Sequence, residues 1–458
     1  MKTGAPACAE IVAEWAAGLS ADAVPEAVRI AMRRSLVDCL GLMVAARNED
    51  YVRAVVASCD AEGPCTAVGH AGGYAPADAM LIGGTAIHGE DFDDTFEGTP
   101  VHVGAVMVPA LIAAAEARRL DGASVLRGLA VGSELVCRLA LVAPTAMHRQ
   151  GFHPTAICGA FGAAAGLAAA MGLKPQQIAS AIGIVGSMAS GIIEYLAEGT
   201  WTKRMHPGWA AQAGWRAARM AENGFLGPRT VFEGQHGAFQ AFAVREIEPD
   251  FSHLSSGWGE RWEAANLALK PYACGTMIQP FIDCAIALRD EIGDASAVAR
   301  VTAKVGEATV HRLWEPRPEK IAPSTPYSAK FSVPFGVATA FVKGAAGLEE
   351  FGEAAIADPA IRELSAKVYY EIDPANEYPK NYTGELLVEL KDGRTLSAAQ
   401  PHLRGGRHAP LDEAELAAKF LANARYGGWP EERSKALAQF AADLFDRSDV
   451  SGLRVFSG

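Results

Sequence analysis

Apolar residues recur every three or four positions through most of the first half of the chain, the spacing that places them on one face of an α-helix. The segment 24–46 shows this spacing, and Pro25 lies near its start, where a missing N–H does no harm. Similar segments follow at 76–88, 103–119, 123–143, 154–171, 175–190 and 207–223. Their Ala- and Gly-rich faces let helices approach closely. The pattern predicts a large all-helical domain over residues 1–268.

The pattern changes from about residue 295 onward. The segments 299–305, 367–372 and 384–390 carry β-branched or aromatic residues at alternating positions, which is typical of strands. Asp392-Gly393 follows the third segment and predicts a hairpin, because both residues tolerate positive φ. We expect a smaller α+β domain over 269–407, and C-terminal helices over 408–458 that return to the helical domain. The predicted fold class is therefore mostly α, with a large helical and a smaller α+β domain.

Length and charge narrow the classes of function. A chain of 458 residues with 50% apolar and 21% charged residues is long enough and apolar enough for two folded domains. A net charge of −12 argues against nucleic-acid binding, so an anionic substrate must meet a local basic cluster. The eight cysteines never form Cys-x-x-Cys, which favours reduced thiols in a cytoplasmic protein over zinc ligands or disulfides.

Neither secretion nor membrane insertion is predicted. Glu10 and Glu14 interrupt the segment that would be the apolar part of a signal peptide. The uncharged run 155–173 approaches the length of a membrane span, but Ala and Gly dominate it and contribute little to insertion. We interpret this run as a tightly packed internal helix.

Four acids occupy the five positions 90–94. Carboxylates so close together repel one another, so at least one is expected to be protonated, paired or bound to a cation. A solvated loop is one alternative. The string Asp91-x-Asp93-x-Thr95 also matches the nucleophile motif of haloacid-dehalogenase-type phosphatases, but that motif must follow a hydrophobic strand, and LIGGTAIHGE precedes it here. A calcium loop is excluded because Gly98 falls at the wrong position.

Two basic segments precede predicted helix starts. His153 comes just before Pro154, at the positive end of a helix dipole, which favours a neutral imidazole and binds anions. Lys203, Arg204 and His206 form the densest cationic patch of the first half. With helix N-terminal N–H groups, this patch is suited to bind a carboxylate, although a solvated basic loop is the alternative.

A third segment, KPYACG (270–275), lies where the helical pattern gives way to the second domain. Clefts between domains are common ligand sites, so Lys270 is a candidate for substrate binding. Cys274 has no evident base partner that would make it a nucleophile.

These segments together resemble the MmgE/PrpD family, which contains 2-methylcitrate dehydratase, cis-aconitate decarboxylase and iminodisuccinate epimerase. The resemblance covers nearly the whole chain. It rests on DFDDT (91–95) followed by His102, GFHPT (151–155), GTWTKRMHPGWAAQAG (199–214), KPYACG (270–275) and AKFSVPF (329–335).

The resemblance implies a large helical domain and a smaller α+β domain, with the active site between them, in a homodimer that uses neither metal nor organic cofactor. Its implied active-site residues are Asp91, Thr95, His102, His153 and Lys203, with Lys270 close to the substrate. Two positions depart from the family pattern, because Gln279 stands where the family has histidine and Phe335 where it has tyrosine.

The expected chemistry is proton transfer at a carbon next to a carboxylate. His102 and His153 are the acid/base candidates, Asp91 is an orienter or second base, and Lys203 stabilises oxyanion charge. The remaining predicted substrate ligands are Thr95, Arg204, His206, Lys270 and Gln279. We expect a dehydratase or decarboxylase acting on a small di- or tricarboxylate such as 2-methylcitrate or cis-aconitate. An epimerase or isomerase and a non-catalytic carboxylate-binding protein are the alternatives.

Overall fold

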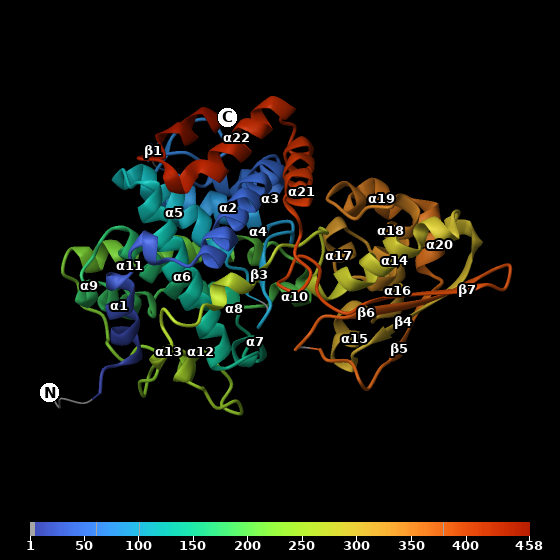
Figure 1. Cartoon of the computed structure of the whole chain (residues 1–458), viewed down its shortest axis with the longest axis horizontal. Coiled ribbons are helices and arrows are strands. Elements are labelled where there is room, and N and C mark those ends of the chain that lie inside the picture. Colours follow the sequence, from blue (N-terminus) through green and yellow to red (C-terminus); the bar gives the residue numbers. More distant parts are fainter. Residues whose placement is uncertain (1–4, 61, 100, 379) are drawn as a thin grey trace. The chain divides into compact units, whose positions relative to one another are not determined.

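A computed structural model describes residues 5–60, 62–99, 101–378 and 380–458 of the chain (Figure 1). The chain forms two units, and it passes from one to the other more than once. The helical unit comprises the chain up to Gly89 together with Asp93–Leu267 and Ala414–Gly458. The α+β unit comprises Glu90–Phe92 and Ala268–Glu413. The predicted fold class, a large helical domain plus a smaller α+β domain, is confirmed.

The helical unit is built from long helices joined by short segments. Its main helices are α1 (Cys8–Gly18), α2 (Glu26–Ala46), α3 (Asp50–Ala57), α4 (Pro76–His88), α5 (Gly104–Arg118), α6 (Gly122–Val142), α8 (Pro154–Ala170), α9 (Pro175–Val185), α11 (Thr202–Glu222), α21 (Glu413–Tyr426) and α22 (Glu431–Asp443). Shorter elements are α7 (Ala146–Arg149), α10 (Tyr195–Glu198), α12 (Ala238–Phe242), α13 (Ser252–Ser255), β1 (Glu62–Cys65), β2 (Thr95–Phe96) and, at the unit boundary, β3 (Leu267–Ala268).

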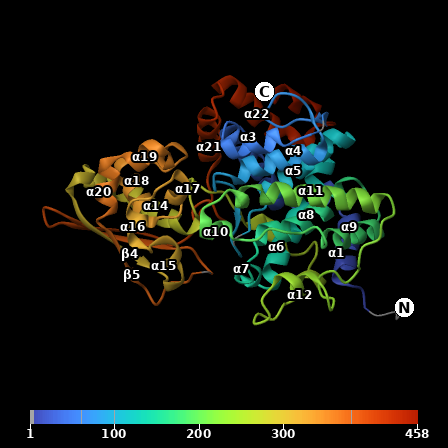
Figure 2. The ribbon, with the colours of Figure 1, turned by 180° about the vertical axis from the view of Figure 1, so that it is seen from behind.

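Glycines let the central helices pack at short range. Helix α11 runs beside α8 and α4 (Figure 2). A Cβ atom added to Gly84 of α4 would lie 2.4 Å from the Cα atom of Gly208 in α11, and one added to Gly166 of α8 would lie 2.5 Å from the carbonyl oxygen of Gly128 in α6. These contacts confirm that the Ala- and Gly-rich faces serve close helix packing.

Helix α11 differs from the prediction at its start. The sequence placed that start at Pro207, but the helix begins at Thr202 and Pro207 lies inside it. The proline removes only the backbone hydrogen bond to the carbonyl of Lys203, and good helix formers such as Lys203 and Arg204 extend the helix before it. Lys203 and His206 therefore lie in the first turns of α11, on one face.

The α+β unit contains a four-stranded sheet in the order β5-β4-β6-β7. Its strands are β4 (Val298–Val305), β5 (Val368–Ile372), β6 (Gly384–Leu390) and β7 (Thr395–Gln400). Strands β4 and β5 are parallel, whereas β6 is antiparallel to both β4 and β7. The predicted hairpin is confirmed, because Gly393 between β6 and β7 has a φ of 90°.

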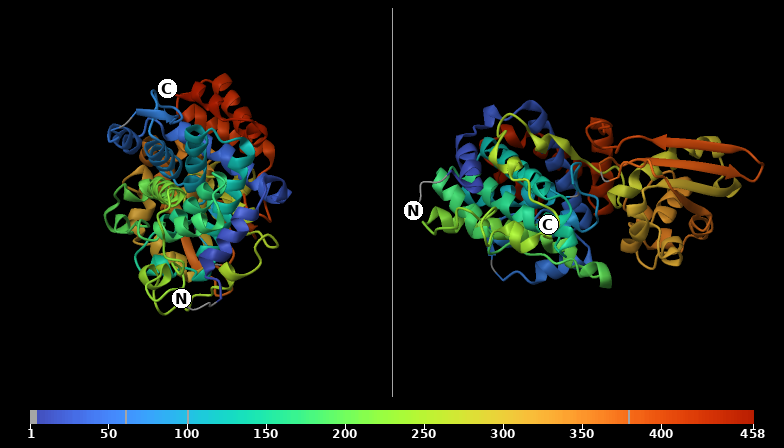
Figure 3. Two further views of the ribbon diagram at one scale, coloured as in Figure 1. Left: turned by 90° about the vertical axis from the view of Figure 1, so that its left-hand side faces the viewer. Right: turned by 90° about the horizontal axis from the view of Figure 1, so that it is seen from below.

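Helices cover one side of this sheet. Leu386, Val388 and Leu390 of β6 are buried, whereas Leu387 between them is 41% exposed, as the alternation of a strand requires. The helices of the unit are α14 (Gln279–Ile292), α15 (Glu307–Leu313), α16 (Arg317–Ile321), α17 (Pro326–Ala329), α18 (Val333–Lys343), α19 (Glu353–Ala357) and α20 (Pro359–Ser365). Helix α14 packs on β6 and β7, and α18 packs on α14 (Figure 3).

The last helices of the chain pack in the helical unit, and the cysteines agree with the expectation of free thiols. Helix α22 packs against α2 of the helical unit. All eight cysteines are free thiols, and all except Cys59 are buried. Within the described ranges, no helix is long and apolar enough to cross a membrane.

Candidate active site

Two buried lysines bind the first part of the acidic segment within the α+β unit. Lys270 Nζ donates to the Asp91 carboxylate at 2.8 Å and to the Asp91 carbonyl oxygen at 2.7 Å. Lys330 Nζ bonds to the Glu90 carboxylate and, at 2.8 Å, to the Glu90 carbonyl oxygen. The backbone of Asp91 has a φ of 56°, in the left-handed region that aspartate tolerates. Two of the four crowded acids are therefore neutralised by ion pairs, as expected.

Asp94 lies in the helical unit and fixes the start of α5. Its Oδ1 accepts hydrogen bonds from the backbone N–H groups of Val103 and Gly104, at 3.0 and 2.9 Å, and its Oδ2 accepts one from Ser35 Oγ at 2.5 Å. Burial is the main cause that raises the pKa of Asp94 to about 6. The carboxylate therefore anchors the turn that presents His102.

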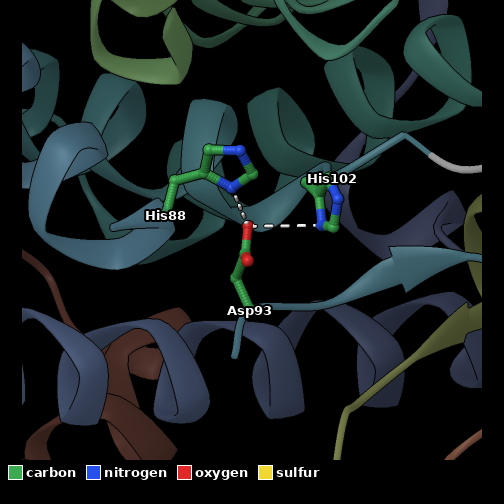
Figure 4. A group of neighbouring side chains, drawn as sticks. All are labelled: His88, Asp93 and His102. Atoms are coloured by element: carbon green, nitrogen blue, oxygen red, sulfur yellow. Dashed lines mark hydrogen bonds and ion pairs between the residues drawn. The ribbon is translucent and has the colours of Figure 1, made fainter. Parts of the chain in front are cut away.

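His102 is oriented by contacts at one ring nitrogen, of which Figure 4 shows the one to Asp93. Its Nδ1 lies 2.8 Å from the Asp94 carbonyl oxygen, 3.4 Å from Thr95 Oγ1 and 3.5 Å from Asp93 Oδ2. Its backbone N–H donates to Thr155 Oγ1 at 3.1 Å. A carbonyl oxygen can only accept, so Nδ1 carries the proton and Nε2 carries the lone pair of the neutral ring. Nε2 is thus the atom of His102 that can act as a base.

His88 and Asp93 form a pair that was not predicted from the sequence. His88 Nδ1 lies 2.8 Å from Asp93 Oδ2, and the two residues are 1% and 0% exposed. The His88 ring lies 4.7 Å from that of His102 (Figure 4). One signal was available, because His88 is the last residue of α4 and stands five positions before Asp93. Within the acidic segment, the motif pointed only to Asp91 and Thr95.

His153 and His206 form a second buried pair. His153 precedes α8, His206 lies in α11, and their Nδ1 atoms are 3.1 Å apart. Burial, with the nearby His88 and Lys203, lowers the pKa of His153 well below its usual value and that of His206 to about 4. Both imidazoles are therefore neutral at pH 7, as predicted for His153. Lys203, 9% exposed, supplies positive charge beside them.

The predicted site residues fall into two groups, one in each unit. The helical unit brings together Thr95, His102, His153, Lys203 and His206, linked through the ring of His88. Arg204 of the same unit stacks on Tyr51, with its guanidinium 4.1 Å from the ring centre. The α+β unit contains Asp91, Lys270 and Gln279.

Gln279 and Phe335, the two departures from the family pattern, are both fully buried in the α+β unit. Gln279 begins α14, and its Nε2 donates weakly to the Cys274 carbonyl oxygen at 3.4 Å. Its buried Oε1 has no hydrogen-bond partner among the described residues. Phe335 lies in the first turn of α18. Burial raises the pKa of the Cys274 thiol far above neutrality, which agrees with the prediction that Cys274 is not a nucleophile.

His88, Asp93 and His102 place three potential metal-ligand atoms within 4.8 Å of one another. The hydrogen bonds favour a proton network there instead. Both Nδ1 atoms face acceptors, at 2.8 Å in each case, and the nitrogen of a donating N–H has no lone pair left for a metal. The two Nδ1 atoms therefore fit a metal ion poorly.

Comparison with known proteins identifies relatives of the chain. The chain is 29% identical to a human cis-aconitate decarboxylase over 396 residues, which cover 82% of this chain and 78% of that protein. It is 26% identical to a cis-aconitate decarboxylase-like protein of Aspergillus oryzae (86% and 84% covered) and 23% identical to a cis-aconitate decarboxylase of Aspergillus terreus (96% and 94%). Residues 10–249 match the MmgE/PrpD N-terminal domain and residues 272–443 match the C-terminal domain, so the chain belongs to the MmgE/PrpD family.

Proposed function

We propose that this protein is a lyase that removes water or carbon dioxide from a small di- or tricarboxylate without a cofactor. The observation that carries the proposal is the orientation of His102. Its Nδ1 is bound to the Asp94 carbonyl oxygen at 2.8 Å, which leaves the Nε2 lone pair for a proton. The relatives named cis-aconitate decarboxylase support the reaction class.

His153 and Lys203 of the helical unit are suited to assist His102 in such a reaction. In a dehydration, His102 Nε2 takes the proton from the carbon next to a carboxylate, the electron pair forms the double bond, and the departing hydroxide takes the proton from the His102 imidazolium and leaves as water. An N–H of neutral His153 is suited to donate a hydrogen bond to the departing oxygen. In a decarboxylation, the electron pair left by carbon dioxide takes a proton from His102 in its imidazolium form. Lys203 stabilises the negative charge that develops on the substrate oxygens.

An epimerase or isomerase is the second candidate, and Gln279 favours it. A glutamine cannot exchange a proton near pH 7, and Phe335 has no hydroxyl to donate. A reaction that returns the proton to the opposite face of the same carbon needs only two exchangeable groups, which His102 and His153 provide. A non-catalytic carboxylate-binding protein is the third possibility.

Turnover separates these three candidates. We would incubate the protein with a panel of di- and tricarboxylates and follow product masses together with thermal stabilisation. A lyase produces a mass loss of water or carbon dioxide. An epimerase leaves the mass unchanged while the stereochemistry changes, and a binder shows a raised Tm with no product. The last result, for every compound that binds, would contradict an enzymatic role.

We further propose that the protein forms a homodimer, as the family resemblance implies. Four large apolar side chains of the helical unit support an interface, because they are exposed in the monomer. They are Ile192 (61%), Leu196 (56%), Trp201 (50%) and Trp209 (39%). Light scattering in solution should give twice the mass of the chain, and a monomer at micromolar concentration would contradict this proposal.

A further inference from the structure

His88 is placed to act on His102 through Asp93. The Oδ2 atom of Asp93 lies 2.8 Å from His88 Nδ1 and 3.5 Å from His102 Nδ1, so one carboxylate oxygen faces both rings (Figure 4). His88 and Asp93 are 1% and 0% exposed. Contacts to a carboxylate are strong when water is excluded, because both the attraction and the cost of a lost donor rise in a low dielectric.

The hydrogen bonds define what each ring contributes. The Nδ1–H group of His88 donates a hydrogen bond to Asp93 and holds this carboxylate in one orientation. The Nδ1–H group of His102 donates a hydrogen bond to the Asp94 carbonyl oxygen. When His102 Nε2 takes up a proton, the ring becomes an imidazolium, and the Asp93 charge beside Nδ1 stabilises it. The proton moves only from the substrate carbon to Nε2, and Asp93 stays ionised.

We infer that His88 is a positioning residue for this reaction: it holds the Asp93 carboxylate beside His102 and thereby makes Nε2 a stronger base. The inference rests on the role of His102 in the proposed function. No role was assigned to His88 from the sequence.

Other charged groups surround His102 and keep their residue types when only His88 is replaced. Asp93 and Asp94 come from the segment after α4. His153 lies at the start of α8, and Lys203 and His206 lie in α11. Because the His88 ring also lies 4.7 Å from that of His102 and 5.5 Å from that of His153, the comparison of His88→Leu with His88→Asn, which both lack the ring, isolates the His88–Asp93 contact.

Two substitutions at His88 separate positioning from simple loss of a buried ring. His88→Asn keeps an N–H donor near the position of Nδ1, whereas His88→Leu fills similar space and has no donor. His70→Asn is the matched control, because His70 lies in the helical unit beside Arg47 and outside the histidine cluster. Tm values identify variants that are merely unstable.

The primary measurement is the NMR titration of His102 in the ligand-free protein, assigned with His102→Asn and made on histidine-labelled samples. We expect the His102 titration in His88→Leu to move to lower pH, while that of His88→Asn stays close to the wild type. kcat/KM at pH 7 should fall roughly tenfold or more in His88→Leu. The acidic limb of its pH–kcat/KM profile should move to lower pH together with the NMR midpoint of His102. Should His88→Leu fail to fold, Asp93→Asn is expected to shift the titration in the same direction.

An unchanged His102 titration in His88→Leu or Asp93→Asn would overturn the inference, as would equal shifts in His88→Leu and His88→Asn. The NMR result does not depend on turnover. If no polycarboxylate reacts, the proposed function fails while the titration still tests the contact. If turnover is normal and the titration does not move, only the role of His88 fails.

Discussion

The Nδ1 atoms of His153 and His206 lie 3.1 Å apart in the helical unit, so one of them must donate and the other must accept. A proton on both nitrogens would place two N–H groups head to head. Burial, the largest cause, lowers the pKa of both rings, and that of His206 falls to about 4. The pair therefore shares a single proton at Nδ1 and is neutral at pH 7.

This pair makes the fold sensitive to acid. Above pH 6.5 His206 is neutral in both the folded and the unfolded chain. As the pH falls, the unfolded chain takes up a proton first, so stability is lost between pH 6.5 and about 4. For His206 alone the loss amounts to about 3 kcal/mol.

The check is the urea midpoint at pH 7.5 and pH 4.5 for the wild type and for His206→Asn, whose amide can accept or donate but does not titrate. We expect the urea midpoint of His206→Asn to decrease less between pH 7.5 and pH 4.5 than that of the wild type. His236→Asn, at an exposed histidine, should behave as the wild type. An equal decrease in all three proteins would show that the His153–His206 pair does not cause the acid sensitivity.

Lys203 is predicted to stabilise the transition state. One preorganised charge is worth about 3–4 kcal/mol, so Lys203→Ala should lower kcat/KM on the order of a hundredfold or more. Lys174→Ala is the control, because Lys174 is an exposed lysine of the same unit. Near-normal kinetics in a correctly folded Lys203→Ala protein would rule out a catalytic role.

Gln279 is predicted to restrict activity on the common family substrates. The wild-type protein should be poor on 2-methylcitrate and cis-aconitate, because a glutamine exchanges no proton. Gln279→His should raise kcat/KM on at least one of them by roughly tenfold or more. Gln240→His, at an exposed position, is the control. Efficient turnover of either compound by the wild-type protein would show that this departure does not matter.

Activity is predicted to survive removal of metal ions. Among the described residues, the side chains that resemble a ligand set belong to His88, Asp93 and His102, and the Nδ1 atoms of both histidines serve as hydrogen-bond donors. kcat/KM should be unchanged after exhaustive treatment with EDTA. If EDTA abolished the activity and magnesium or zinc restored it, the reaction would depend on a metal ion, contrary to this prediction.

Local patterns in the sequence predicted much of the fold. Helical periodicity located α4 at Pro76–His88, and alternation located β6 at Gly384–Leu390, because each pattern reflects which face of one element is buried. The start of α11 was missed since Pro207 looked like a first residue. Whether a helix continues through a proline depends on the packing around it, which sequence periodicity does not contain.

The sequence predicted several residues of the candidate site but few of the contacts between them. His102, His153 and Lys203 were found because motifs carry them. The pairing of His88 with Asp93 arises where the segment after α4 turns back, and that turn is held by Asp94 through Ser35, far away in sequence. Such contacts depend on the tertiary fold, so the five-residue spacing of His88 and Asp93 is a signal that does not establish their contact.

The most direct test of this account is proton transfer at carbon in heavy water, with wild-type protein and His102→Asn. The asparagine keeps a donor for the Asp94 carbonyl oxygen and removes only Nε2. With a panel of di- and tricarboxylates followed by NMR, we expect loss of carbon dioxide with one deuterium gained, or loss of water with the C–H proton released. His102→Asn should abolish this reaction, whereas His70→Asn should retain it. Undiminished turnover in His102→Asn, or no reaction of the wild-type protein with any polycarboxylate, would contradict the account.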